Sequence, residues 1–216
     1  IENDNIVLNF IDITKKWNSV PRTLIEANKL FFKYFDFSLN IKNEFNKLYK
    51  ELFIDDNILG FHYRGTDKMG PEVRIAYSES FYINFDTTLE ILKKELKRLN
   101  TNKMFVATDD SKILTLLQDN IPDLQIITVT HDYETTSGIP LHKNPKNNNA
   151  NKSTKYKIGS SAIIDSLLLS KCKCLIKYAS HLSAYSILFN PNLEAYRLNK
   201  CNYSWFPENR IKDYIN

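Results

Sequence analysis

An apolar run that ends in a dense group of charged residues is the part of this sequence best suited to chemistry. The run Ile58-Leu-Gly-Phe leads at once into five ionisable side chains: His62, Arg64, Asp67, Lys68 and Glu72. In an open α/β sheet, ligands bind beyond the carboxyl ends of the strands. If the run is a strand, the sequence therefore predicts a binding site for an anionic substrate where that strand ends.

The residue types in this group suit a pyrophosphate and a proton transfer. Arg64 offers a bidentate fork to phosphate oxygens, and Lys68 offers a point charge. A glycine at position 65 would let the backbone approach a ligand closely. Asp67 would orient Arg64, and Glu72 would take a proton from an attacking hydroxyl. The alternative is a loop whose charges pair with one another at the surface; the order and density of the residues favour the binding site.

A pair of carboxylates follows the next apolar run, at Thr108-Asp109-Asp110. Paired carboxylates at a strand end can hold a metal or bind sugar hydroxyls, whereas Asp is also a good helix N-cap. We expect Asp110 to act as a cap, and both interpretations stay open for Asp109. Because no third hard oxygen ligand lies nearby in the sequence, we predict no metal.

Three further polar residues lie within or beside apolar segments. Asp165 lies in a nearly continuous apolar helix, where a carboxylate is costly to bury unless it is paired or hydrogen-bonded. It would either accept hydrogen bonds from a guanine base or form a cap or salt bridge. Ser180 and His181 lie where a strand runs into a helix, and helix N-terminal amides form an anion site. The alternative for Ser180 is a simple N-cap.

Strand and helix patterns alternate around these positions. Strands are expected at 57–63, 104–108, 124–129, 174–178 and 194–198. Helices are expected at 21–35, 41–53, 78–99, 159–170, 183–189 and 209–214. A further helix is expected to begin in the Asp109–Ser111 region and to end at about residue 119. The polar stretch 131–156 lacks periodicity. This alternation predicts an α/β fold with a Rossmann-like parallel sheet flanked by helices. We expect residues 56–216 to form that domain and residues 1–55 to form a helical N-terminal segment.

Composition narrows the class of protein. The 216 residues carry a net charge of +4 without a block of like charges, so a nucleic-acid partner is not predicted. Three cysteines favour a reducing compartment. No apolar stretch approaches the ~20 residues that span a bilayer, so any membrane association would be peripheral. The Asn-, Lys- and Ile-rich composition favours a bacterium or virus and a cytoplasmic location over the Golgi lumen, where a trimmed anchor would be required. The start at Ile1 predicts a missing preceding segment.

Three motifs in order carry a resemblance to a known family. They are Gly60-Phe-His-Tyr-Arg-Gly-Thr-Asp-Lys68, then Phe105-Val-Ala-Thr-Asp-Asp110, and then Ile163 to Ser170 followed by Leu175-Ile176 and Ser180. The first resembles the signature G-V-H-x-R-R-T-D-K of the α1,6-fucosyltransferases and related bacterial nodulation fucosyltransferases. The second and third resemble the other two motifs of that family. The likeness spans about residues 31–190. Common nucleotide and hydrolase motifs, namely Walker A, G-x-G-x-x-G and G-x-S-x-G, are absent.

The resemblance implies a GT-B glycosyltransferase that transfers fucose from GDP-fucose to a glycan or glycoconjugate hydroxyl. The reaction would invert the anomeric carbon and need no cofactor or metal. This chain would supply the donor-binding domain, with residues 1–55 as a remnant of the acceptor-side domain.

The resemblance also implies a role for each matched residue. Arg64 would bind the pyrophosphate and stabilise the leaving GDP, and His62 and Asp165 would contact the guanine. Glu72 would be the catalytic base, assisted by Lys68. The remaining implied contacts are Asp67 and Asp109 holding the active-site loop and the sugar, and Gly65, Ser180 and His181 at the donor site.

The sequence departs from the family pattern at two of these positions. Gly65 replaces the second Arg of the signature, which removes a positive charge beside the phosphates. His181 and Leu182 follow Ser180 where polar residues are expected. Two alternatives therefore stay open: a GT-B transferase that uses another nucleotide sugar, and a catalytically silent nucleotide- or glycan-binding module.

Overall fold

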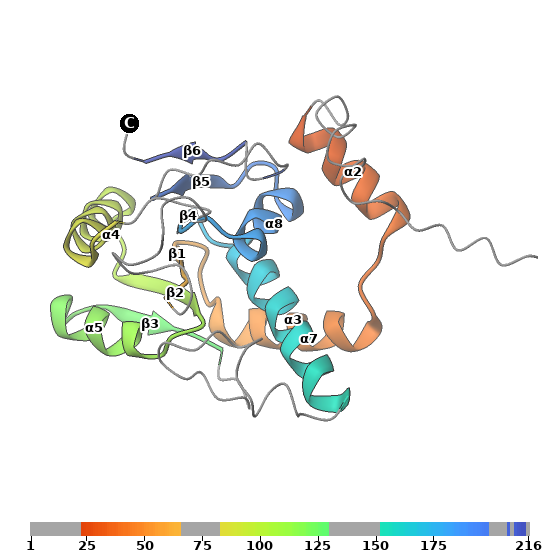
Figure 1. Ribbon diagram of the computed structural model, residues 1–216, viewed down its shortest axis with the longest axis horizontal. Coiled ribbons are helices and arrows are strands. Elements are labelled where there is room, and N and C mark those ends of the chain that lie inside the picture. The colour runs from red at the N-terminus through yellow and green to blue at the C-terminus, as the bar shows by residue number, and fades with distance from the viewer. Residues whose placement is uncertain (1–22, 66–82, 130–151, 199–206, 208–209, 215–216) are drawn as a thin grey trace, which may run out of the picture.

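A six-stranded parallel sheet forms the core of the described part of the chain (Figure 1). The computed structural model describes residues 23–65, 83–129, 152–198, 207 and 210–214. Every neighbouring pair of strands is parallel, in the order β3-β2-β1-β4-β5-β6. The strands are β1 (Leu59–Tyr63), β2 (Lys103–Thr108), β3 (Gln125–Ile127), β4 (Cys174–Lys177), β5 (Glu194–Arg197) and β6 (Lys212–Asp213). This is the strand order of dinucleotide-binding folds, and it confirms the predicted Rossmann-like sheet.

Helices cover both faces of the sheet, as Figure 1 shows. One face packs against α3 (Leu39–Leu52), α7 (Lys152–Leu169) and α8 (His181–Phe189). The other face packs against α4 (Phe85–Leu99) and α5 (Lys112–Asn120). A further helix, α2 (Leu24–Tyr34), lies against α8. The helical segment before the sheet therefore packs onto the α7/α8 face, while its assignment as a remnant of an acceptor-side domain stays a prediction.

Alternation of side chains along the strands divides the core into two halves. In β1, Leu59 and Phe61 belong to the cluster on the α4/α5 face, whereas the neighbouring Ile58 belongs to the cluster on the α7/α8 face. Because both faces are covered, the strands are apolar almost throughout, as is usual in parallel sheets. Buried polar residues in these strands therefore need a particular reason, and those of β1, β4 and β5 (His62, Lys177 and Arg197) lie at or next to the carboxyl ends.

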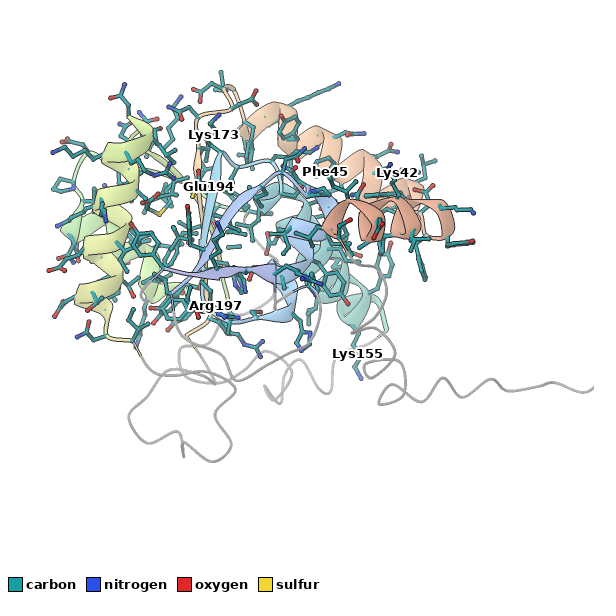
Figure 2. All side chains as sticks on the ribbon, turned by 90° about the horizontal axis from the view of Figure 1, so that it is seen from above. Lys42, Phe45, Lys155, Lys173, Glu194 and Arg197 are labelled. Atoms are coloured by element: carbon teal, nitrogen blue, oxygen red, sulfur yellow. The ribbon has the colours of Figure 1, made fainter. Side chains whose placement is uncertain are left out.

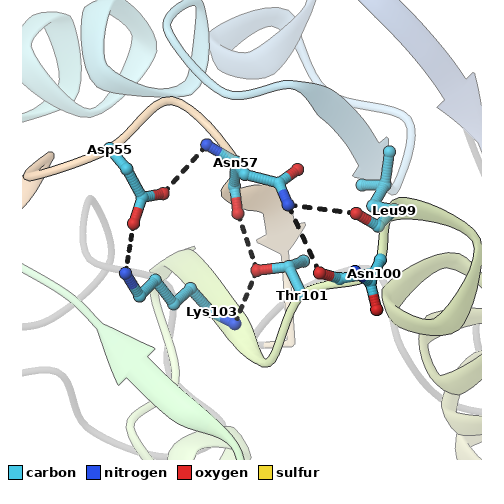
Figure 3. Close-up of polar contacts among 6 residues, drawn as sticks. All are labelled: Asp55, Asn57, Leu99, Asn100, Thr101 and Lys103. Atoms are coloured by element: carbon cyan, nitrogen blue, oxygen red, sulfur yellow. Dashed lines mark hydrogen bonds and ion pairs between the residues drawn. The ribbon is translucent and has the colours of Figure 1, made fainter.

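A group of hydrogen bonds joins the amino ends of β1 and β2 to the end of α4 (Figure 3). The Asn57 side-chain amide donates to the carbonyls of Leu99 (3.0 Å) and Asn100 (3.4 Å). The Thr101 hydroxyl donates to the Asn57 carbonyl at 2.7 Å, and Lys103 forms an ion pair with Asp55. Asn100 ends the helix in the left-handed conformation, with φ of 51°, which Asn tolerates well. These bonds hold the carboxyl end of α4 against the segments that precede β1 and β2.

The substitution Asn57→Ala is expected to lower the free energy of unfolding by about 1–2 kcal/mol, because two helix-terminal carbonyls lose their donor. Urea denaturation measures this change. Asn102→Ala is the matched control, since it removes one exposed bond to the Asp123 carbonyl. The control should lose clearly less stability; equal losses in both variants would contradict the role given to Asn57.

The helix expected at 78–99 begins later, at Phe85, because Asn84 is its N-cap and accepts from the Thr87 amide at 2.8 Å. Two further predicted elements are wrong. The helix expected at 209–214 is absent from the described residues there, which instead include the edge strand β6. Tertiary contacts outweigh local preference: the Tyr214 amide donates to the Arg197 carbonyl at 2.7 Å, and the Tyr214 hydroxyl donates to Glu95 at 2.7 Å. The second error is the extent of the polar stretch, because α7 already begins at Lys152. Its first turns carry exposed polar side chains such as Lys155, so apolar periodicity does not mark them.

Candidate functional site

The strand order places the topological switch point of the sheet between β1 and β4. The helices that follow β1 and β2 cover one face of the sheet, whereas α7 and α8 cover the other. The direction of winding therefore changes between β1 and β4, and ligands of open α/β sheets bind beyond the carboxyl ends of the strands at this switch point. His62 and Lys177 are paired in register at these two strand ends. The predicted cluster thus begins where the fold itself favours a ligand.

His62 is a buried imidazole with an unsatisfied nitrogen. Its side chain is 5% exposed, and its Nδ1 atom has no hydrogen-bond partner among the described residues. Burial, together with the positive charges of Lys177 and Arg64, lowers the pKa of His62 to about 3. The ring is therefore neutral at physiological pH. Buried polar atoms in native proteins are normally paired, so an orphaned ring nitrogen at a strand end points to a ligand.

This burial predicts a pH-dependent loss of stability. His62 has an ordinary pKa of 6.5 when unfolded and about 3 when folded, so the unfolded state binds more protons between these values. The stability that the neutral ring contributes is complete above pH 6.5 and falls as the pH drops towards 3. Between pH 7 and pH 5 we expect His62 to account for a loss of about 2 kcal/mol.

Urea denaturation at pH 7 and pH 5, in wild type and His62→Gln, measures this contribution. The difference between the two pH values should shrink by about 2 kcal/mol in the variant, because glutamine does not titrate. An unchanged difference would show that His62 is protonated in the folded state.

The loop that follows β1 is anchored by the end of β2. The Gly65 amide donates to Asp109 Oδ1 at 2.9 Å. Asp109 therefore contacts the backbone directly after Arg64, while its predicted roles as a sugar ligand or a helix cap stay predictions. Asp110 instead accepts from the Lys112 amide at 3.1 Å. The predicted capping role of Asp110 is confirmed, although the N-cap position itself belongs to Ser111.

Gly65 lies where a side chain would be crowded. A Cβ atom built there would lie 2.4 Å from Cε1 of Tyr63 and 3.1 Å from Cβ of Asp110. Contacts below 3.0 Å require a neighbour to move, so the Tyr63 ring fills space that a larger residue would need. The loop in this conformation therefore suits glycine. The second arginine of the family signature is missing at position 65, and its side chain would not fit there.

Asp165 is buried on α7, on the side of the sheet that carries His62. Its side chain is 6% exposed. The neighbouring Ser166 hydroxyl donates to the Leu182 carbonyl at 2.8 Å, which joins this part of α7 to the first turn of α8. The Asp165 carboxylate thus belongs to the same helix layer as the amino end of α8.

Ser180 and His181 form the start of α8. Ser180 occupies the N-cap with extended backbone, but its hydroxyl makes no capping hydrogen bond in the described part of the chain. It is buried, whereas His181, the first helical residue, is exposed. The hydroxyl of Ser183, one turn into the helix, is fully buried and has no hydrogen-bond partner within the described ranges.

Sequence reasoning missed two cations at the same edge. Lys177 is fully buried at the end of β4, and Arg197, its register partner on β5, is 7% exposed. Arg197 forms an ion pair with Asp213 on β6 at 2.6 Å. The signal in the sequence that could have indicated Lys177 is its place at the end of the buried apolar run Cys174-Leu-Ile-Lys177.

Three predicted catalytic residues lie outside the described residues: Asp67, Lys68 and Glu72. Their roles stay predictions. Of the other predicted positions, the structure places His62, Arg64 and Gly65 along the end of β1, Asp109 at the end of β2, and Asp165, Ser180 and His181 on the α7/α8 side.

Within the described ranges, no three His, Cys, Asp or Glu side chains gather as a possible metal site. In the same part of the chain, no helix has both the length and the apolar character needed to span a bilayer. Burial raises the pKa of both described cysteines, that of Cys174 to about 12, so these thiols stay protonated near neutral pH.

A comparison with protein-family models identifies the family of this chain. The sequence matches the family described as nodulation protein Z (NodZ) over residues 17–210. No curated protein sequence matches it significantly. Among solved structures, a NodZ alpha-1,6-fucosyltransferase soaked with GDP-fucose is 21% identical with a TM-score of 0.46, over 76% of this chain and 46% of that one.

Two other solved structures are similar to the chain. The fucosyltransferase NodZ from Bradyrhizobium is 22% identical with a TM-score of 0.46, again over 76% of this chain and 46% of that one. POFUT1 in complex with GDP-fucose is 8% identical with a TM-score of 0.45, over 75% and 46%. The chain thus spans about half the length of the solved structures that it resembles.

Proposed function

The chain belongs to the nodulation protein Z family, and from this premise we propose that it forms the donor-binding half of a GT-B fucosyltransferase. The donor would be GDP-fucose, and the acceptor a hydroxyl of a glycan or glycoconjugate. The observation that carries the proposal is the orphaned, buried nitrogen of His62, which lies at the switch point of the sheet beside Arg64 and Lys177.

The guanine would bind on the α7/α8 side of β1. A neutral imidazole can donate from one nitrogen and accept at the other, so His62 suits the polar edge of a base. Asp165, buried on α7, would accept hydrogen bonds from the ring N–H and the amino group of guanine. Uracil lacks that pair of adjacent donors, so the same carboxylate favours a guanosine nucleotide.

The diphosphate would meet Arg64, directly after β1. Its fork would bind phosphate oxygens and stabilise the charge that develops as GDP leaves. The hydrogen bond that the Gly65 amide donates to Asp109 supports this role, because it fixes the backbone on the carboxyl side of Arg64. An arginine held in place by the fold needs little reorganisation in the transition state.

The transfer would proceed by a single displacement. Glu72 would take the proton of the acceptor hydroxyl as its oxygen bonds to the anomeric carbon, while the bond from that carbon to the diphosphate breaks. Attack from the face opposite to GDP inverts the configuration. Arg64 and Lys68 would supply the positive charge that other glycosyltransferases obtain from a metal, so the reaction is proposed to be metal-independent.

The acceptor site is proposed to lie largely outside this chain. The chain covers 46% of a solved NodZ fucosyltransferase, and the helical segment at 1–55 is proposed as part of the acceptor side. A cytoplasmic location, peripheral to a membrane that carries the acceptor glycan, completes the proposal.

A silent nucleotide-binding module is the second candidate, favoured by the crowded Gly65 position and its missing charge. GDP-fucose labelled in the sugar separates the two, with transfer to a panel of glycans and release to water measured in the presence of a chelator. GDP-mannose and a UDP-sugar serve as controls. If the sugar is transferred to a glycan or released to water from GDP-fucose but not from the two controls, the result supports an enzyme. Binding of GDP without either reaction supports the silent module.

A further inference from the structure

Tyr63 and Tyr178 are neighbours at the carboxyl ends of β1 and β4. The Tyr178 amide donates to the His62 carbonyl at 3.2 Å, directly beyond the paired part of the two strands. Both rings pack in the apolar cluster on the α4/α5 face. They meet edge to face, with 5.4 Å between the ring centres and 87° between the ring planes. The two strand ends are therefore joined on the face opposite to the His62 side chain.

The Tyr178 hydroxyl makes a buried hydrogen bond to the start of α4. Tyr178 and Thr88 are both buried, and their hydroxyl oxygens lie 2.6 Å apart. Because the Thr88 hydroxyl donates to the Asn84 carbonyl at 3.2 Å, it accepts from Tyr178. Tyr178 is thus held both by packing around its ring and by a hydrogen bond from its hydroxyl.

The Tyr63 ring in turn lies beside the backbone that follows Arg64. A Cβ atom built on Gly65 would lie 2.4 Å from Cε1 of Tyr63, so the ring fills the space next to this backbone. The Gly65 amide also donates to Asp109 at 2.9 Å. Residue 65 is therefore in contact with an aromatic ring and with a carboxylate, and these contacts restrain the backbone at Arg64.

The backbone next to Arg64 has a particular need for such a restraint. The family signature has a second arginine at position 65, and this chain has glycine there. Glycine has more backbone freedom than any other residue, so by itself it does not hold Arg64 in one orientation. The row of contacts from α4 through Tyr178 to Tyr63 supplies a restraint from the fold.

We propose that Tyr178 and Thr88 are positioning residues of the donor site, which act through the Tyr63 ring on Arg64. This inference rests on the proposed function and adds two residues to it. An arginine that is held in place before the ligand arrives loses less conformational freedom when it binds a diphosphate. Both residues lie on the α4/α5 face, whereas the guanine is proposed to bind on the other face, so they support the contact with the phosphates and not the contact with the base.

Calorimetric titration of Tyr178→Phe with GDP and with guanosine tests the inference. The substitution removes only the hydroxyl, and the Thr88 hydroxyl keeps its bond to the Asn84 carbonyl. GDP binding is expected to weaken roughly 3- to 10-fold, the range for one neutral hydrogen bond, while guanosine binding stays unchanged.

Tyr196→Phe is the matched control, because it makes the same chemical change on the same face of the sheet. The Tyr196 hydroxyl donates to Glu194 at 2.9 Å. Figure 2 shows Glu194 at the end of the sheet opposite to Arg197, and therefore away from the carboxyl ends of the strands. The control should bind GDP and guanosine as tightly as wild type.

Combination with Arg64→Ala shows whether Tyr178 acts through the arginine. In that background there is no arginine to position, so Tyr178→Phe should cause no further loss of GDP affinity. An equal loss in the two backgrounds would overturn the inference, because Tyr178 would then act independently of Arg64.

The other outcomes also have distinct meanings. Equal GDP affinity in wild type and Tyr178→Phe overturns the inference and leaves the proposed donor site standing. A parallel loss for GDP and guanosine overturns it as well, because Tyr178 then supports the whole fold. Failure of wild type to bind GDP overturns both the inference and the proposed function.

Thr88 provides a second test that leaves Tyr178 intact, in case Tyr178→Phe does not fold. Thr88→Val keeps a similar shape without the hydroxyl and is expected to weaken GDP binding by the same roughly 3- to 10-fold. Thr88→Ser keeps the hydroxyl and should retain the wild-type affinity. Equal GDP affinity in these two variants would contradict the role given to the hydrogen bond.

Discussion

Replacing Arg64 by alanine is expected to slow fucose transfer from GDP-fucose by roughly 10²- to 10³-fold, the range for losing one preorganised donor to a developing negative charge. Arg64 follows β1 at the switch point, and the Gly65–Asp109 hydrogen bond fixes the backbone beside it. Because the charge on the leaving diphosphate grows in the transition state, the loss should fall on kcat more than on the affinity for the donor.

Initial rates across a range of GDP-fucose concentrations measure this effect. Arg64→Lys is the matched control, since it keeps the charge but loses the planar fork, and its rate should lie between those of wild type and Arg64→Ala. Equal turnover in wild type and Arg64→Ala would remove Arg64 from the catalytic assignment, whatever the affinity for GDP.

Asp165→Asn is expected to weaken GDP binding by roughly 10²-fold and to reduce the preference for GDP over UDP and ADP. In the proposed site the carboxylate would accept from two guanine donors, whereas the amide would present one acceptor and one competing donor, and charged hydrogen bonds are the stronger ones. The side chain is buried on α7, so solvent screens it little.

Competition titrations with the three nucleotides give this preference directly. Asp119→Asn makes the same chemical change on the exposed last turn of α5 and should leave all three affinities unchanged. If Asp165→Asn keeps the wild-type preference, Asp165 does not select the guanine.

The sequence predicts the fold well because the patterns that mark strands and helices are local along the chain. Alternation of apolar strands with helices is enough for a parallel sheet, and the charge cluster at His62 and Arg64 marks a strand end without knowledge of the partner strands. One exception is β6: its place depends on the Arg197–Asp213 and Tyr214–Glu95 contacts, which join distant parts of the chain.

The candidate site is predicted less completely, because it depends on register. His62, Lys177 and Arg197 form one row only after β1, β4 and β5 are paired, and the sequence does not give that pairing. The Asp109–Gly65 bond likewise spans 44 residues of chain. The roles of Asp67, Lys68 and Glu72 remain predictions from the motif.

The most direct test of the donor site is calorimetric titration of the protein with GDP, alongside UDP and ADP, in buffer that contains a chelator. The account predicts that GDP binds in preference to the other two, without added metal, and that Arg64→Ala weakens this binding. Equal affinity for all three nucleotides, or no binding of GDP, would contradict it.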